Sequence, residues 1–227
     1  MITILIPCFN EEKVIGHNIQ KIHNFFENKK YIFELVVINN ASTDNTLKVL
    51  KEINKAYEIK ILNENKKGKG NAIKLGLLNS KYDNVLILDA DLSTDINELK
   101  DEWLKLKNSL LIGSRALGEE IDTPKIRRLS GLFLNKIIRL FFDIQFRDTQ
   151  CGFKFIAYEN ISSLANDLSI EGFMYDLDLI TLCKKLRIDI KEIPIKYIFN
   201  KNSSVSLITD PLVMLFEMLQ IRKKIKS

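Results

Sequence analysis

The chain has 227 residues, 46% hydrophobic and 28% charged, which is typical of a globular protein with a full-sized core. Its formal net charge of +5 does not indicate nucleic acid as a partner, but it suits an anionic ligand or an anionic membrane surface. The cysteines Cys8, Cys151 and Cys183 are odd in number and far apart. They argue against a disulfide framework or a zinc site and favour a reducing compartment.

No signal peptide and no membrane-spanning segment are expected. Met1 leads directly into the strand-like stretch "ITILIP", with no basic region and no cleavage site. No stretch approaches the roughly 20 apolar residues that cross a bilayer. The nearest candidates, residues 129–142 and 211–221, are shorter and carry charges. Any contact with a membrane is therefore expected to be peripheral.

The first half of the chain alternates predicted strands and helices. Apolar runs predict strands at 2–6, 34–38, 58–62, 84–88 and 110–113. Helical spacing and capping residues predict helices at 11–28, from about 46 to 53, at 71–78 and at 95–107. Strands that are apolar on both faces and separated by helices indicate an α/β fold with a mostly parallel sheet covered on both sides.

The second half is less regular. A basic helix is expected at 125–142 and another helix within 171–186. Residues 190–200 alternate like a strand, and Pro194 favours a position at the edge of the sheet. The tail, 211–227, is expected to form an amphipathic basic helix. A soft boundary is placed near residue 114, within one compact unit.

Asp89 and Asp91 directly follow the predicted strand 84–88 in the stretch "NVLILDADLST". In open α/β sheets, ligands bind where the strands end at their carboxyl edge. Two carboxylates one residue apart suit Mg²⁺ or Mn²⁺ shared with phosphate oxygens. The sequence therefore predicts a metal and phosphate site at this edge.

Several motifs together resemble the family 2 glycosyltransferases of the GT-A fold. In the first half these are "IPCFNEE", "INNASTDNT", "NKKGKGNA" and "LDADLST", one at the end of each of the first four strands. In the second half, "GSR", "RRLS", "DTQCGFKFI" and "FMYDLDLI" resemble the dolichyl-phosphate β-glucosyltransferase group and related polyprenyl-phosphate glycosyltransferases. The resemblance covers about residues 2 to 205.

The resemblance implies a nucleotide-sugar site in the first half, with Asp89 and Asp91 as metal ligands. Cys8 and Phe9 stand where the family usually has Ala and Tyr. Asn39 and Asn40 replace an acidic pair, so the preferred base stays open. The implied nucleotide-sugar residues are Pro7, Cys8, Phe9, Glu11, Asn39, Asn40, Ser42, Lys69, Asp89, Ala90 and Asp91.

On the acceptor side, the resemblance implies phosphate-binding arginines, because a guanidinium binds phosphate as a planar fork. The implied acceptor residues are Arg115, Arg127, Arg128, Gln150, Lys154 and Asp176. The implied catalytic residues are Asp89, Asp91, Arg115 and Arg128. The expected division of the chain is a nucleotide-sugar half at 1–113, an acceptor half at 114–205 and the tail helix at 206–227.

The implied reaction is inverting transfer of a hexose, glucose, from UDP-glucose to a dolichyl or polyprenyl monophosphate. Such a phosphate is already ionised at pH 7, so no general base is required. Mg²⁺ or Mn²⁺ would neutralise the departing diphosphate. The expected location is cytoplasmic, peripheral on the cytosolic membrane face, where the helix 129–142 and the tail meet anionic lipid.

Two alternatives remain open at this stage. A sugar or protein hydroxyl as acceptor would need a general base, for which Asp176 is the candidate. A non-catalytic nucleotide-sugar binding module would also fit the motifs. A nucleotidylyltransferase is disfavoured, because "IPCFNEE" lacks the glycine-rich, arginine-containing loop that such enzymes have after the first strand.

Overall fold

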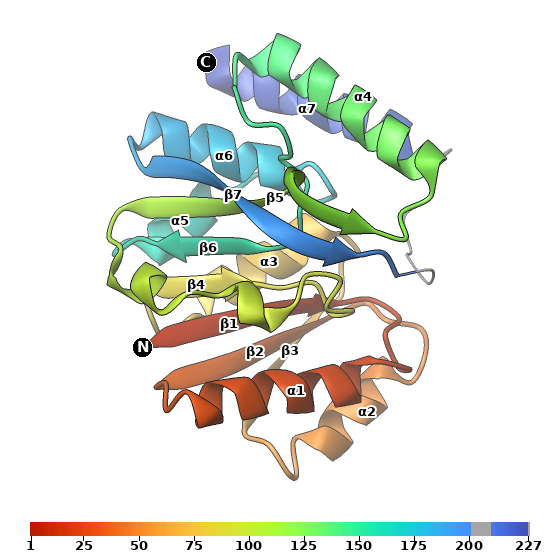
Figure 1. Cartoon of the computed structure of the whole chain (residues 1–227), viewed down its shortest axis with the longest axis vertical. Helices are drawn as coiled ribbons and strands as arrows, with labels where there is room; N and C mark the ends of the chain where they lie inside the picture. Colours follow the sequence, from red (N-terminus) through yellow and green to blue (C-terminus); the bar gives the residue numbers. More distant parts are fainter. Residues whose placement is uncertain (201–209, 227) are drawn as a thin grey trace.

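Seven strands form one sheet, in the order β3-β2-β1-β4-β6-β5-β7, in the computed structural model, which describes residues 1–200 and 210–226 (Figure 1). Neighbouring strands run parallel except β6, which is antiparallel to both β4 and β5. The strands are β1 (Ile2–Cys8), β2 (Phe33–Asn40), β3 (Ile59–Glu64), β4 (Asn84–Ile87), β5 (Ser109–Ile121), β6 (Lys154–Ala157) and β7 (Asp189–Ile198).

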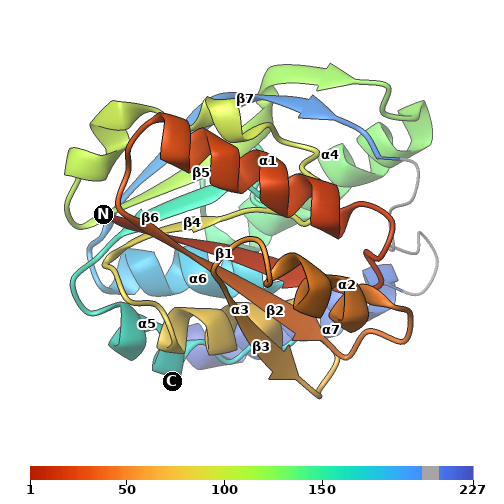
Figure 2. The same cartoon turned by 90° about the horizontal axis from the view of Figure 1, so that it is seen from below.

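Helices cover both faces of this sheet, as Figure 2 shows, with α1 on one face and α3, α5 and α6 on the other. The helices are α1 (Ile15–Asn28), α2 (Thr46–Ile53), α3 (Lys69–Leu78), α4 (Lys125–Phe142), α5 (Ile161–Asp167), α6 (Tyr175–Lys185) and α7 (Asp210–Lys226). Two short 3₁₀ helices, η1 (Ile96–Glu98) and η2 (Asp101–Lys105), lie between β4 and β5.

The central strand β1 has apolar side chains on both faces, and these build two cores. Ile4 and Ile6 pack toward α1, while Leu5 packs with Ile73 and Leu77 of α3, and all five are fully buried. Burial on both faces is the reason that β1 reads as a continuous apolar run instead of an alternating one.

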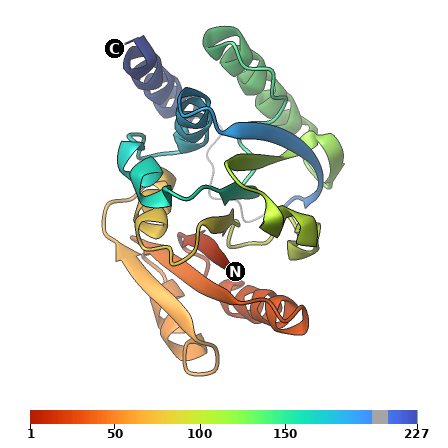
Figure 3. The same ribbon diagram turned by 90° about the vertical axis from the view of Figure 1, so that its left-hand side faces the viewer.

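A third, smaller core lies at the end of the molecule opposite α1 and α2, where α4 and α7 are found (Figures 1 and 3). Ile138 of α4 and Met218 and Ile221 of α7 are buried there against Met174 and Leu177, at the start of α6. The basic helix and the tail helix are therefore tied to the same part of α6.

Every strand predicted from the sequence is present, and β7 lies at the sheet edge, as Pro194 indicated. The predicted basic helix 125–142 matches α4. β5 is longer than predicted and runs through residue 113, so both halves belong to one sheet. The division at residue 113 thus remains a prediction about function. Part of the predicted tail, residues 206–209, lies outside the described residues.

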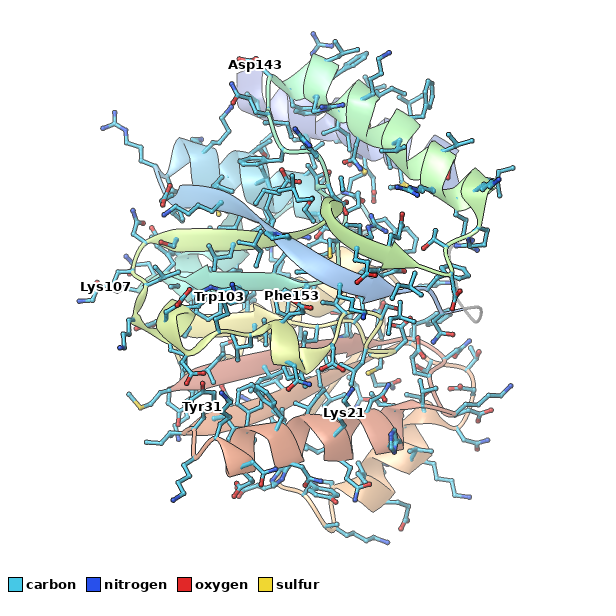
Figure 4. All side chains as sticks on the ribbon, in the orientation of Figure 1. Lys21, Tyr31, Trp103, Lys107, Asp143 and Phe153 are labelled. Carbon is cyan, nitrogen blue, oxygen red and sulfur yellow. The ribbon has the colours of Figure 1, made fainter. Side chains whose placement is uncertain are left out.

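The predicted helix at 95–107 is wrong, because this segment forms η1 and η2 instead. Leu99 and Lys100 between them have extended backbone angles. Trp103 lies at the sheet with its ring centroid 6.1 Å from that of Phe153 (Figure 4). Anchoring of the apolar residues in the core therefore overrides their helical spacing. The helix α5 was not predicted.

Within the described ranges, 1–200 and 210–226, no helix has both the length and the apolar character required to traverse a bilayer.

The packing of α1 on the sheet predicts a large effect of Phe26→Ala. Phe26 is fully buried, and its ring stacks on that of Phe33 with centroids 5.1 Å apart. Removing the ring is expected to lower the free energy of unfolding by about 3–5 kcal/mol, measured by urea denaturation. His17→Ala on the exposed side of α1 is the control and is expected to change it by less than about 0.5 kcal/mol. Equal effects of the two substitutions would contradict this packing.

Candidate active site

The predicted site residues gather at one edge of the sheet, because β2, β1 and β4 are parallel neighbours. Their carboxyl ends bring Asn39, Phe9 and Asp89 to the same side. The antiparallel β6 begins where these strands end, since Lys154 pairs in register with Ile87. The loop "DTQCGF" that precedes β6 therefore arrives at the same edge, although it lies far away in sequence.

Asp89 forms the centre of a cluster of charges. Its Oδ1 lies 2.5 Å from Nζ of Lys69, the first residue of α3, and both side chains are partly exposed to solvent. Burial alone would raise the pKa of Asp89, but Lys69, Lys154 and Arg115 outweigh it and lower this pKa. Asp89 is therefore held ionised at neutral pH, as a metal site requires.

Gly152 allows the loop before β6 to reach Asp89. A Cβ atom at this position would lie 1.8 Å from Oδ2 of Asp89. No other residue fits without displacing the carboxylate or the loop. This contact gives a physical reason for the glycine in "DTQCGF".

Asp91 lies beside Asp89 and is oriented by Ser93, whose N–H and Oγ donate to its two carboxylate oxygens over 2.9 and 2.8 Å. Burial and the charge of Asp89 raise the pKa of Asp91. Burial and the charges of Asp91 and Asp89 likewise raise the pKa of Glu11 to about 7. The crowded negative charge at this edge favours a bound cation.

Asp89 and Asp91 fit a divalent cation that is completed by a substrate. In the part of the chain that the structure describes, no group of three or more His, Cys, Asp and Glu side chains could hold a metal. The protein would thus supply one or two carboxylates, which is the usual protein share of a Mg²⁺ site that also binds phosphates.

Arg115 is held by Asp148 from the loop before β6. Its Nε and Nη2 donate to the two carboxylate oxygens over 2.7 and 2.9 Å, and its guanidinium lies 5.3 Å from the ring centroid of Tyr197. Burial alone would raise the pKa of Asp148, but the Arg115 guanidinium outweighs this effect and lowers the pKa. The pair fixes a cation close enough to contribute to the ionisation of Asp89.

Lys154 and Asp176 do not face an acceptor, contrary to prediction. Lys154 is 0% exposed and Asp176 is 3% exposed. Their Nζ and Oδ1 lie 2.5 Å apart, and Lys154 also donates to the carbonyl of Cys151 over 2.5 Å. Burial raises the pKa of Asp176, with Lys154 and Lys69 acting against it. Lys154 and Asp176 therefore form a buried ion pair beneath the site surface. Their burial could not be recognised from the sequence.

The asparagines that end β2 serve the adjacent loop. Asn40 is buried, donates to the carbonyl of Lys66 over 2.9 Å and accepts from the N–H of Gly68 over 2.9 Å. Asn39 donates to Oδ1 of Asn63 over 3.1 Å, and its own Oδ1 is buried without a partner among the described residues. Asn40 thus shapes the loop that leads to Lys69.

Other predicted contacts to the nucleotide sugar differ in exposure. Cys8 is fully buried and cannot line the nucleotide in this conformation, contrary to prediction. Ala90 is nearly buried, and its carbonyl accepts from Asn18 over 2.8 Å. The partly exposed residues at this edge are Pro7, Phe9, Glu11, Ser42, Lys69, Asp89 and Asp91.

Phe9 has a cation on its ring that the sequence did not single out. Nζ of Lys67 lies 4.1 Å from the ring centroid. Tyr175 was also missed. It is buried with Lys69 and Lys154 at 5.8 and 6.0 Å from its ring centroid. Both contacts join residues that are distant in the chain, so no local pattern could have indicated them.

Of the remaining predicted acceptor-side residues, Gln150 contacts this cluster, while Arg127 and Arg128 contact other residues. Arg128 is 3.4 Å from Glu120 of β5, and Arg127 lies 5.3 Å from the ring centroid of Phe199. Gln150 is near the cluster, since its N–H donates to Asp148 over 3.3 Å. Its Nε2 is buried and has no hydrogen-bond partner among the described residues.

Comparison with known proteins identifies the family. The family model described as glycosyl transferase family 2 matches residues 3–160, well over half of the chain. The chain belongs to glycosyl transferase family 2. This stretch contains the cluster around Asp89 and the loop before β6.

Curated relatives of this family 2 chain include a dolichyl-phosphate beta-glucosyltransferase of Trichomonas vaginalis, 28% identical over 86% of the chain and 65% of that protein. The chain thus spans just under two thirds of the length of this relative. The dolichyl-phosphate beta-glucosyltransferase of Saccharomyces cerevisiae is 30% identical over 97% of the chain and 74% of its own length.

Among solved structures, glucosyl-3-phosphoglycerate synthase of Mycobacterium tuberculosis aligns with a TM-score of 0.68 over 98% of this chain and 80% of that one, at 17% identity. Mannosyl-3-phosphoglycerate synthase of Rubrobacter xylanophilus aligns with a TM-score of 0.69 over 99% and 73%, at 18% identity. At such identities the likeness concerns the fold, which is the predicted GT-A fold.

The ion pair between Arg115 and the buried Asp148 predicts a large cost for Asp148→Ala. The substitution leaves a guanidinium without its carboxylate, and it is expected to lower the free energy of unfolding by about 3–5 kcal/mol in urea denaturation. Because the folded pKa of Asp148 is lowered, its contribution is present above the ordinary value of 3.8 and is lost as pH falls through the folded pKa.

The matched control for this pair is Glu119→Ala, because Glu119 forms an exposed pair with Lys196 at 3.7 Å. Exposed pairs contribute about 0–1 kcal/mol, so little change is expected. The difference between wild type and Asp148→Ala should also shrink as the pH falls below 3.8. A difference that does not depend on pH would contradict the ionic origin.

Proposed function

We propose that this protein transfers glucose from UDP-glucose to a dolichyl or polyprenyl monophosphate, with inversion at the anomeric carbon. The observation that carries the proposal is the cluster around Asp89, with two adjacent carboxylates and Lys69 and Arg115 at the carboxyl edge of a family 2 fold. The names of the curated relatives supply the sugar and the acceptor. UDP-glucose and Mn²⁺ were bound together in a structural relative, the glucosyl-3-phosphoglycerate synthase of Mycobacterium tuberculosis.

Asp89 and Asp91 would hold Mg²⁺ or Mn²⁺, which supplies positive charge to the leaving diphosphate when bound. Lys69 is paired with Asp89 at the start of α3 and is the cation proposed to contact the diphosphate. Arg115, oriented by Asp148, is the cation proposed to hold the acceptor phosphate.

The burial of Asp176 favours a phosphate acceptor over a hydroxyl. A hydroxyl must lose a proton to a general base, and Asp176 was the candidate. With 3% exposure and a close ion pair to Lys154, this carboxylate does not reach a substrate. A lipid monophosphate needs no base because it is ionised at pH 7, so the protein has only to position it in line with the anomeric carbon.

The metal assignment predicts that Asp91→Ala keeps the fold but loses at least about 100-fold in turnover, because the leaving group loses its cation. The assay is release of nucleoside diphosphate from UDP-glucose with Mg²⁺ and a polyprenyl monophosphate in detergent. Asp95→Ala is the control, since this nearby Asp pairs with Lys21 outside the cluster, and near-normal turnover is expected. An unchanged turnover number in Asp91→Ala would end the assignment.

The same assay on wild type separates the candidate functions. Release that depends on the lipid supports both donor and acceptor. Release from another nucleotide sugar, but not from UDP-glucose, would support the same mechanism with a different donor. Asn39 and Asn40 would then be the residues to test for base preference. Tight nucleotide binding without release with any acceptor would instead favour a non-catalytic binding module.

A lipid acceptor must be met at a membrane, and we propose that α4 and α7 provide the contact on the cytosolic face. Both helices bury one face against α6 and expose apolar side chains on the other. All charged side chains described on α4 are basic, and the one acidic side chain described on α7, Glu217, points inward. The exposed apolar residues are Ile126, Leu129, Leu132, Phe133, Leu140, Phe141, Val213, Leu215, Phe216, Leu219 and Ile225.

This surface, named here the α4–α7 face, predicts binding to anionic vesicles. Wild type is expected to float with phosphatidylserine-containing liposomes, because apolar side chains insert while basic ones meet the headgroups. Phe133→Glu combined with Phe216→Glu is expected to abolish flotation. Ile32→Glu is the control, since Ile32 is as exposed but lies near the end of α1. Wild type that stays in the bottom fraction would contradict the proposal.

A further inference from the structure

Glu217 joins α7 to the loop before α6. Its side chain is buried, and its two carboxylate oxygens accept from the N–H groups of Gly172 and Met174 over 2.9 and 3.0 Å. Met174 is the N-cap residue of α6, and its own side chain cannot accept a hydrogen bond from the helix. Glu217 therefore supplies, from another helix, an acceptor for the N–H of the N-cap residue, and it ties the loop just before α6 to α7.

The same loop also holds the beginning of α3. The carbonyl of Gly172 accepts from the N–H of Gly70 over 3.1 Å, and that of Glu171 accepts from Asn71 over 3.1 Å. The N–H groups in the first turn of a helix have no partner within the helix, so they depend on such outside acceptors. One loop, residues 170–174, thus connects the starts of α3 and α6 to α7.

These contacts are tight enough to transmit a displacement. A Cβ on Gly70 would lie 2.0 Å from the carbonyl oxygen of Ile170, and a Cβ on Gly172 would lie 2.2 Å from Oε1 of Glu217. Backbone at this spacing has no free volume in which one partner could move alone. A shift of the loop away from α7 would therefore move the first turn of α3.

Both helix starts carry residues of the site. Lys69 is the first residue of α3 and pairs with Asp89, while Asp176 is the second residue of α6 and pairs with Lys154. Glu217 touches none of these four side chains. Its influence on the site would pass through the loop 170–174.

We propose that Glu217 is a positioning residue for nucleotide-sugar binding: by holding the loop 170–174 against α7, it fixes Lys69 beside the diphosphate. The inference rests on the proposed function, because it requires a nucleotide sugar to bind at Lys69. It makes the tail helix part of the donor site as well as of the α4–α7 face.

The test compares full-length wild type with Glu217→Ala, Glu217→Gln and Ile221→Ala in the nucleoside diphosphate assay. Glu217→Ala is expected to raise the KM for UDP-glucose about tenfold, the equivalent of one hydrogen bond to a charged group. Its KM for the lipid phosphate is expected to stay near that of wild type. Glu217→Gln keeps one acceptor oxygen, so a smaller rise is expected, and it carries the comparison if the alanine variant does not fold.

Ile221→Ala is the control for a purely structural role. Ile221 is fully buried in the same cluster on α7 but contributes no side-chain hydrogen bond to the loop. This variant is expected to be less stable while its KM for UDP-glucose stays near the wild-type value. A KM that follows stability in all three variants would overturn the inference.

Amide hydrogen exchange without substrate gives an independent reading of the link. In Glu217→Ala, exchange is expected to accelerate at Gly70 and Asn71 as well as at Gly172 and Met174, while the amides of α2 stay unchanged. Wild-type exchange at Gly70 and Asn71 in a folded variant overturns the inference even if the proposed function holds. A wild type that turns over no donor would count against the proposed function instead.

Discussion

The ionic cluster around Asp89 is the feature on which the rest of this structure depends. A carboxylate that is partly removed from water keeps a low pKa only if cations and hydrogen bonds compensate for the lost solvation. Here Lys69 comes from α3, Arg115 from β5 and Lys154 from β6, so three separate elements must arrive at one strand end. The antiparallel course of β6 makes this possible, because its first residue, Lys154, lies beside Ile87, where β4 ends.

Around this cluster the interior charges alternate in sign. Asp148 orients Arg115, and Asp176 neutralises Lys154, which has no contact with water at all. In each pair, the carboxylate holds a flexible basic side chain in one position. The backbone also contributes to this arrangement. Gly152 has no side chain, and this lets the loop before β6 lie against the Asp89 carboxylate.

The asparagines at the end of β2 have a structural role that the usual acidic pair could not fill in the same way. Asn40 donates to one backbone group and accepts from another. A carboxylate here could accept from Gly68 but would face the carbonyl of Lys66 without a proton to donate. The amide therefore suits this chain's own loop, whatever base the site accepts.

The sequence by itself determined every strand except β6, the edge at which ligands are expected to bind and the two carboxylates at its centre. Continuous apolar runs can be buried on both faces only in a sheet covered by helices, and such sheets collect polar residues where their strands end. The helix 125–142 and the edge strand with Pro194 could also be predicted from the sequence. The spacing of apolar residues and the effect of a proline both act locally.

Only the tertiary structure decided which of the polar residues face a ligand. Cys8, Lys154 and Asp176 stand in motifs that suggested contact, yet all three are buried, since their neighbours come from distant strands. The segment 95–107 does not form the predicted helix, because Trp103 packs in the core. Glu217 reaches the loop 170–174 only because α7 packs against α6. Pairing between groups far apart in the chain depends on how the elements pack, and no local pattern of residues encodes it.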